Sequence, residues 1–299
     1  MKRLVWLASY PKSGNTWMRL LLASYQRPEN QPFHLKNAFG ISKSESRRTC
    51  FERAAGITEG PTHRFLTEDE ILLLRNKVQS ELAASVTPPT VIKTHNAFVK
   101  VRGTPVICPD VTLGAIYVVR NPMDVVDSFA DHMGITIDAA ITAMNDPKHR
   151  IGGPRKPMVT QYLQTWSGHV TSWLRQPLFP VHLVRYEDLK TSPRTTLRNA
   201  VTFLGWQVDD QRIERAVAET EFQKLRTAEQ AEGFIEKSDK SKSGRFFRKG
   251  ESGQWARSLS SDQITAMTEH HRQVMQQLDY TTTIPNTTRR NQEHAQQEG

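Results

Sequence analysis

Four short apolar runs separated by helical patterns constrain the fold of this chain more than any other feature. Each run is rich in β-branched residues and apolar at successive positions, a pattern typical of strands buried on both faces of a parallel sheet. The runs are residues 4–8, 90–94, 115–119 and 181–186. Helical patterns occupy residues 16–25, 67–84, 122–132, 160–174 and 193–204. This alternation predicts an α/β fold with a central parallel sheet flanked by helices on both faces.

The remaining segments are polar and long. We expect residues 26–62, 133–158 and 228–256 to be loops over a site, since loops of this length are commonly functional. No repeat or linker interrupts the chain, so residues 1–283 are predicted to form a single domain. Residues 284–299 are predicted to be a polar tail without core residues.

Charge and cysteine content restrict the partners and the compartment. The formal net charge of +9 favours an anionic partner, whether a nucleotide, a phosphorylated or sulfated ligand, a nucleic acid or an anionic membrane surface. The two cysteines lack metal-ligand spacing, which favours reduced cytosolic thiols over a single disulfide. The first apolar run is too short for a secretory signal, and no run has the ~20 apolar residues of a membrane span. We therefore expect a cytoplasmic protein without membrane insertion.

The sequence SYPKSGNTW follows the first apolar run and precedes the first helix. A helix N-terminus offers free backbone N–H groups to an anion, and Gly14 allows close approach of the backbone. Lys12 adds a cation. Side-chain hydrogen bonds to phosphate oxygens are available from Ser13, Asn15 and Thr16. The segment predicts a phosphate-binding loop, although the pattern G-x-x-x-x-G-K-[ST] is missing; the alternative is an ordinary turn capped by Ser13 or Asn15.

The segment YVVRNPMDVVDSF places Arg120 just after the third apolar run and Ser128 about two turns into the next helix. An Arg at the carboxyl end of a parallel strand lies where α/β sheets bind ligands, and its fork geometry suits phosphate. The alternative is an ion pair between Arg120 and Asp124 or Asp127.

The segment VIKTHNAF places Lys93 and His95 at the end of the second run, where both project to the same side. A His is suited to remove a proton near neutral pH, and a Lys beside it can stabilise negative charge. The alternative for His95 is a structural hydrogen bond. In GRFFRKGESGQW, Arg248, Lys249 and Gly250 could surround a phosphate, and the alternative is a solvated basic loop. No His, Cys, Asp or Glu spacing predicts a metal site.

In this order, the four segments resemble the soluble sulfotransferases that use 3'-phosphoadenosine 5'-phosphosulfate (PAPS). YPKSGNTW is similar to their 5'-phosphosulfate loop, YVVRNPMDVVDSF to their 3'-phosphate motif, and RKGESGQW to their C-terminal RKG-x-x-G-x-W segment. KTH matches the position of their catalytic base, and RYEDL and TEFQKL match two further segments. The matches span residues 4–255. The resemblance implies the P-loop-kinase-like sulfotransferase fold.

The resemblance also implies a role for each matching residue. Lys12 would contact the 5'-phosphosulfate and neutralise the leaving oxygen, His95 would deprotonate the acceptor hydroxyl, and Lys93 would stabilise the transferring sulfuryl group. The 5' cradle would be completed by Ser13, Gly14, Asn15 and Thr16. The 3'-phosphate would be held by Arg120, Ser128, Arg248, Lys249 and Gly250. The adenosine would be lined by Trp17, Tyr186, Thr220 and Phe222.

The predicted activity is transfer of a sulfuryl group from PAPS to a hydroxyl, or an amine, of a small organic acceptor. The product of the donor would be 3'-phosphoadenosine 5'-phosphate (PAP), with no metal and no nucleic-acid partner. The alternatives are a kinase-like nucleoside triphosphate enzyme and a non-catalytic protein that binds anions or nucleic acid. Asn15, where the commoner form has Thr, and the compact N-terminus that begins almost at the first strand resemble bacterial small-molecule and natural-product sulfotransferases. The dimerisation sequence of animal members is not evident after residue 255, so no oligomeric state is predicted.

Overall fold

A five-stranded parallel sheet forms the centre of the computed structural model, which describes residues 3–38, 42–57, 64–86, 89–248 and 250–280. The strand order is β2-β3-β1-β6-β9. The strands are β1 (Leu4–Ala8), β2 (Ser42–Ser44), β3 (Thr90–Thr94), β6 (Thr112–Val119) and β9 (Val181–Arg185). All four predicted strands are present, and β2 is a fifth.

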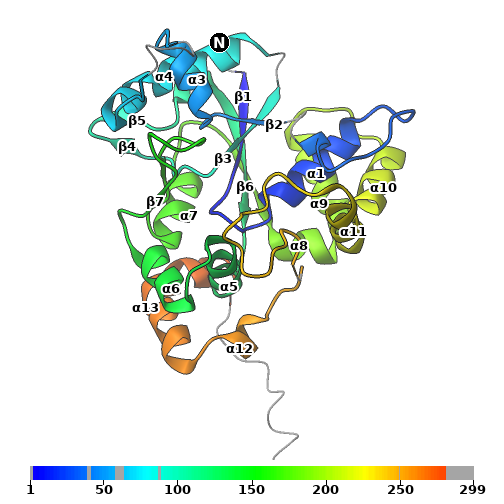
Figure 1. Cartoon of the computed structure of the whole chain (residues 1–299). Coiled ribbons are helices and arrows are strands. Elements are labelled where there is room, and N and C mark those ends of the chain that lie inside the picture. The colour runs from blue at the N-terminus through cyan, green and yellow to red at the C-terminus, as the bar shows by residue number, and fades with distance from the viewer. Residues whose placement is uncertain (1–2, 39–41, 58–63, 87–88, 249, 281–299) are drawn as a thin grey trace, which may run out of the picture.

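Helices cover both faces of the sheet, as predicted (Figure 1). On one face lie α1 (Asn15–Gln26), α9 (Pro193–Phe203) and α10 (Asp210–Glu219). On the other face lie α5 (Pro122–Met133), α7 (Trp166–Leu174) and α13 (Ser261–Gln277). Strand β1 contributes side chains to the hydrophobic cores on both faces of the sheet, because its side chains alternate between the faces. Leu4, Trp6 and Ala8 pack with α5 and α7, whereas Val5 and Leu7 pack with α1.

The remaining elements surround these layers. The helices are α3 (Arg48–Ala54), α4 (Glu68–Ala84), α6 (Ile137–Asn145), α8 (Tyr186–Thr191), α11 (Phe222–Glu232), α12 (Trp255–Ser258) and the 3-10 turn η1 (Pro109–Val111). The short strands are β4 (Lys100–Val101), β5 (Thr104–Pro105), β7 (Arg150–Ile151) and β8 (Gln161–Tyr162). Helix α4 begins where the sequence predicts, because Thr67 and Glu70 form a capping box.

Several predicted boundaries are wrong. Residues 26–62 are not only loop, since they contain β2 and α3, and residues 133–158 contain α6, which Thr136 caps. The helix predicted from residue 160 begins at Trp166 instead. Gln164 has a left-handed backbone (φ 61°) and Thr165 is the N-cap, so the chain turns there before the helix starts.

Strand β9 also departs from the prediction that the strands are buried on both faces. Of its five residues only Val184 is buried. The reason is its position at the edge of the sheet, with β6 as its neighbour on one side. The predicted tail at residues 284–299 lies outside the described residues.

The topology places the site. Since all five strands are parallel, their carboxyl ends meet at one edge of the sheet. Strands β3 and β6 lie on opposite sides of β1, and the helices α1 and α5 that follow β1 and β6 pack on opposite faces. The loops after β1 and β6 therefore diverge, which is the arrangement that opens a ligand crevice in α/β sheets.

Two further observations concern the helices and the cysteines. Among the described helices none is long and apolar enough to cross a membrane. Cys50 and Cys108 are both free thiols, and Cys108 is buried.

Candidate active site

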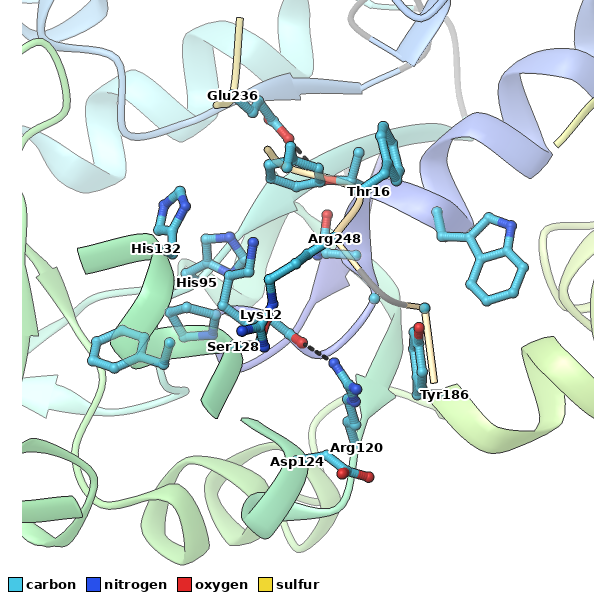
Figure 2. Close-up of a pocket in the computed structure, with 18 of the residues that line it drawn as sticks. Lys12, Thr16, His95, Arg120, Asp124, Ser128, His132, Tyr186, Glu236 and Arg248 are labelled. Carbon is cyan, nitrogen blue, oxygen red and sulfur yellow. Dashed lines mark hydrogen bonds between the residues drawn. The ribbon is translucent and has the colours of Figure 1, made fainter. Parts of the chain in front are cut away.

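A cavity at the carboxyl edge of the sheet brings most of the predicted residues together (Figure 2). The predicted residues that line it are Lys12, Gly14, Asn15, Thr16, Trp17, Lys93, His95, Arg120, Ser128, Tyr186, Phe222, Arg248 and Gly250. Ser13 and Thr220 are buried behind the cavity wall, and Lys249 lies outside the described residues. Residues from six separate segments of the chain thus converge on one space.

The loop after β1 is held in a conformation that favours anion binding. Lys12 and Gly14 both have left-handed backbones, with φ of 68° and 105°. Gly14 is the N-cap of α1, and no side chain in the described part of the chain caps this helix. The alternative of a turn capped by Ser13 or Asn15 is therefore wrong, and the first N–H groups of α1 are left for another acceptor.

Asn15 and Ser13 have different roles behind this loop. Asn15 Nδ2 donates to Leu7 O at 2.9 Å and to Ser9 Oγ at 3.2 Å, which ties the loop back to β1. Ser13 Oγ is buried and has no hydrogen-bond partner among the described residues. A buried hydroxyl without a partner is unfavourable, and this one lies between Lys12 and Gly14 in the chain, which both line the cavity.

An aromatic chamber lies on one side of the loop. Trp17 contacts Tyr186 and Phe222 edge to face, with ring centroids 5.7 and 6.3 Å away. Trp17 Nε1 donates to Thr220 O at 2.9 Å, so Thr220 positions the indole through its backbone. A Cβ on Gly14 would lie 2.7 Å from Tyr186 Cδ2, which shows how closely the loop approaches this ring. The chamber has the flat apolar surfaces that a purine base needs.

Arg120 connects the loop after β1 to the C-terminal segment. Its guanidinium donates to Lys12 O at 3.4 Å and to Glu251 O at 2.8 Å, and lies 4.2 Å from the centre of the Tyr186 ring. Arg120 Nε is buried without a partner in the described part of the chain. Arg120 makes these contacts in place of the alternative ion pair with Asp124 or Asp127. Its side chain is part of the cavity lining.

Asp124 and Asp127 instead organise the C-terminal segment, and the sequence prediction missed this role. Asp124 accepts hydrogen bonds from Gly253 N at 2.8 Å and Trp255 N at 3.3 Å. Asp127 forms an ion pair with Arg248. Both carboxylates come from α5, so this helix fixes the basic segment over the cavity.

His95 is held in one tautomer. Its Nδ1 lies 2.8 Å from Ser9 O, and since a carbonyl oxygen can only accept, Nδ1 carries the proton. The lone pair is then on Nε2. Burial and the neighbouring Lys93 lower the pKa of His95 well below its usual value of 6.5, so the ring is neutral near pH 7. A neutral imidazole with a fixed tautomer can accept a proton at Nε2.

His169 supports the backbone of this segment from the core. His169 is fully buried and its Nε2 lies 3.1 Å from His95 O, which makes Nε2 the donor. Its Nδ1 then accepts from the Tyr117 hydroxyl at 2.8 Å. The chain of hydrogen bonds fixes where β3 ends.

Lys12 lies between the loop and the opposite wall. Its Nζ is 4.1 Å from the centre of the Phe246 ring. Burial, and then the charge of Arg120, lower the pKa of Lys12 to about 8. An anion bound in the cavity would therefore stabilise the protonated, charged form of Lys12.

Glu236 and His132 are two further titratable residues of the cavity that the sequence prediction missed. Glu236 lies in the third predicted loop and contacts both Thr16 and Lys93, at 2.7 and 2.9 Å. His132 is at the end of α5, and burial together with Lys12 and Lys93 lowers its pKa to about 4. Glu236 has no local sequence pattern that distinguishes it, because it enters the site through the folding of a distant segment. His132 comes four residues after Ser128 on α5, so helix periodicity could have placed it on the same face as that predicted residue.

Part of the cavity lining is apolar. It is formed by Phe129, Met133, Ile151, Met158 and Phe246. In the described ranges of the chain, no group of three or more His, Cys, Asp or Glu side chains is arranged to hold a metal ion. The cavity lining therefore combines basic and polar groups, which we call its anion-binding half, with these apolar side chains, which we call its apolar half.

Residues 2–279 match the model of the sulfotransferase domain family. The chain belongs to this family. The sulfotransferase is 22% identical over 292 residues to Sulfotransferase 1A1 of Rattus norvegicus, which covers 92% of this chain and 85% of the relative. It is 26% identical over 266 residues to Cytosolic sulfotransferase 7 of Arabidopsis thaliana, covering 83% of this chain and 71% of the relative. The predicted membership of the sulfotransferase family is confirmed, and the assignment to bacterial small-molecule or natural-product members stays a prediction.

Solved structures of the same fold include mouse sulfotransferase SULT7A1 complexed with PAP, with a TM-score of 0.59 and 20% identity over 92% of this chain and 85% of that chain. Retinol dehydratase in complex with androsterone and the inactive cofactor PAP has a TM-score of 0.58 and 19% identity, over 95% and 83% of the two chains. The sulfotransferase fold predicted from the sequence is confirmed.

Proposed function

We propose that this sulfotransferase moves the sulfuryl group of PAPS to a hydroxyl of a small organic acceptor, with His95 as the general base. The observation that supports this most is the hydrogen bond from His95 Nδ1 to Ser9 O. It leaves the Nε2 lone pair on a ring that is neutral near pH 7 and lies beside the anion-binding loop.

The residues present fit the donor. Ser13 Oγ and Arg120 Nε are buried atoms without partners in the described part of the chain, and both belong to loops at the cavity. Lys12, Ser13, Gly14, Asn15 and Thr16 are proposed to hold the 5' end of PAPS. Arg120, Ser128, Arg248, Lys249 and Gly250 are proposed to hold the 3'-phosphate, and Trp17, Tyr186, Thr220 and Phe222 to surround the adenosine.

PAPS supplies an activated sulfuryl group, and the chain's residues manage protons and charge. As the acceptor oxygen bonds to sulfur, its hydroxyl proton moves to His95 Nε2. The bond from sulfur to the bridging oxygen of the 5'-phosphate breaks, and its electron pair stays on that oxygen to give PAP. Lys12 would neutralise this oxygen and Lys93 the sulfuryl oxygens.

The acceptor is proposed to occupy the apolar half of the cavity. Phe129, Met133 and Phe246 offer apolar surface there, beside His95. A related structure, retinol dehydratase, is described in complex with retinol or with androsterone. A small apolar molecule that carries a hydroxyl, or an amine, fits this half of the site.

Ligand binding followed by turnover tests the proposal against a kinase and against a non-catalytic protein. We expect PAP to raise the melting temperature of the purified chain, whereas ATP with Mg²⁺ and coenzyme A raise it less. Turnover of PAPS against phenols, sterols, sugars and amines then identifies the acceptor. Stabilisation by ATP with Mg²⁺ and not by PAP would contradict the proposal.

A further inference from the structure

A carboxylate of the chain itself occupies part of the anion-binding half of the site. Glu236 Oε2 accepts from Arg19 Nη2 at 2.6 Å and from Thr16 Oγ1 at 2.7 Å, while Oε1 accepts from Lys93 Nζ at 2.9 Å (Figure 2 shows the contact with Thr16). The side chain of Glu236 is 16% exposed and that of Arg19 is 1% exposed. Burial alone would raise the pKa of Glu236, but Lys93 and Arg19 hold it well below its usual range.

The three groups around this carboxylate form a compact set of donors. Thr16 and Arg19 are one turn apart on α1, and Arg19 Nη2 also donates to Thr16 Oγ1 at 3.0 Å. Lys93 comes from β3 on the other side. A guanidinium, an ammonium and a hydroxyl therefore donate to one carboxylate, which is the arrangement that recognises an oxyanion.

The segment that carries Glu236 is exposed on both sides of this residue and has one buried anchor. The chain around it is anchored by Phe234, which packs on Phe246 and Phe247 with centroids 4.9 and 5.6 Å away. Between this anchor and Glu236, Ile235 is 82% exposed, and Lys237 on the other side is also exposed. Rotation of this short exposed segment would move the carboxylate out while Phe234 stays in place.

We propose that Arg19, Lys93 and Thr16 form an oxyanion subsite that Glu236 fills in the free protein and that the 5' end of the donor takes when Glu236 leaves. The proposal rests on the function proposed above. It adds Arg19 to the groups that bind the donor and makes Glu236 a competitor of the donor within the chain. The group bound is the sulfuryl group or the 5'-phosphate of the donor. Both are tetrahedral oxyanions, which a guanidinium and an ammonium recognise.

The test is a set of binding measurements on Glu236→Gln. This variant keeps the size of the side chain and an acceptor for Thr16 but removes the competing charge. We expect its Kd for PAPS, measured by calorimetry without acceptor, to be lower than that of the wild type by roughly tenfold. Asp239→Asn is the matched control, because it removes the same charge from an exposed position of the same segment. The control should leave the Kd unchanged.

Three nucleotides separate the outcomes. A gain in affinity for PAPS alone assigns the subsite to the sulfuryl group. A gain in affinity for both PAPS and PAP assigns it to the 5'-phosphate, and either result supports the proposal. An equal gain with adenosine 3'-phosphate, which has no 5' group, would overturn it, as would an unchanged or higher Kd for PAPS and PAP. If the wild type binds neither PAP nor PAPS, the proposed function itself is wrong.

Arg19 is tested in the same background. In Glu236→Gln, the further change Arg19→Gln should abolish the gain in affinity for the donor. If the double variant folds and keeps the full gain, Arg19 is not part of the subsite.

Discussion

His95 Nδ1 and the backbone carbonyl of Ser9 are 2.8 Å apart, so the loop that follows β1 fixes the imidazole at the end of β3. Burial and Lys93 lower the pKa of this ring well below 6.5. The ring is therefore protonated only in more acidic solution, and activity that needs neutral His95 is retained as the pH falls from neutrality to 6.5. We expect kcat/KM to be flat over this interval and to fall only below it. An ascending limb with a midpoint at or above pH 6.5 would contradict the assignment.

Lys12 makes the affinity for PAP depend on pH on the alkaline side. Its pKa is about 8 in the free protein, and a bound phosphate raises it by stabilising the charged form. Above pH 8, binding must therefore take up a proton, and the affinity should fall by up to about tenfold per pH unit. The phosphate itself does not titrate there, since its second pKa is near 6. Calorimetry at pH 7 to 9.5 measures this slope.

Lys12→Arg is the control, because a guanidinium stays charged throughout this range. Its affinity for PAP should be nearly independent of pH above 8. The same slope in the variant and the wild type would assign the effect to another group.

Gly14→Ala tests the close contact between the loop and Tyr186. The added Cβ would lie 2.7 Å from Tyr186 Cδ2, at a backbone φ of 105°. Gly103→Ala is a matched control with φ of 81° and no atom near the added Cβ. Both variants should lose about 1–2 kcal/mol of unfolding free energy to backbone strain. Only Gly14→Ala should also weaken PAP binding, and equal affinity in the two variants would show that the contact does not shape the site.

Asp124→Asn tests how the C-terminal segment is held. An amide offers one oxygen acceptor where Asp124 meets the N–H groups of Gly253 and Trp255, so one donor would face an NH₂ group. We expect the free energy of unfolding, measured with urea, to fall by about 1–3 kcal/mol. PAP affinity should fall as well, because this segment presents Arg248 and Gly250. Unchanged stability and affinity would show that Asp124 does not hold the segment.

The four apolar runs predicted four of the five strands of the sheet and the strand ends at which the site lies, and the resemblance to soluble sulfotransferases supplied the other cavity residues. Apolar strands can be recognised from their composition alone. In a parallel sheet, the residues that follow these strands must meet at one edge. For that reason Lys12, His95 and Arg120 could be placed at the carboxyl ends of the strands from their positions alone, whereas Tyr186 was assigned to the site through the resemblance to soluble sulfotransferases. Strand β2 was missed because Ser42–Ser44 is three polar or charged residues long, and only its pairing with β3 makes it a strand.

Glu236 and Asp124 could not be predicted in the same way. Glu236 reaches Thr16 across 220 residues of sequence, in a segment whose composition is that of a solvated loop. Asp124 looked like an ion-pair partner for Arg120, and only the path of the C-terminal segment shows that it accepts backbone N–H groups instead. Contacts of this kind depend on how loops close over the sheet, which local patterns do not encode.

The most direct test of the account is the rate of sulfuryl transfer from PAPS by His95→Ala, measured in a single turnover together with the Kd for PAP. We predict a loss of roughly 10²- to 10⁴-fold in the rate, as expected for removal of a general base, with little change in PAP affinity. Transfer at the wild-type rate by a variant that binds PAP normally would contradict the central claim that His95 removes the acceptor's proton.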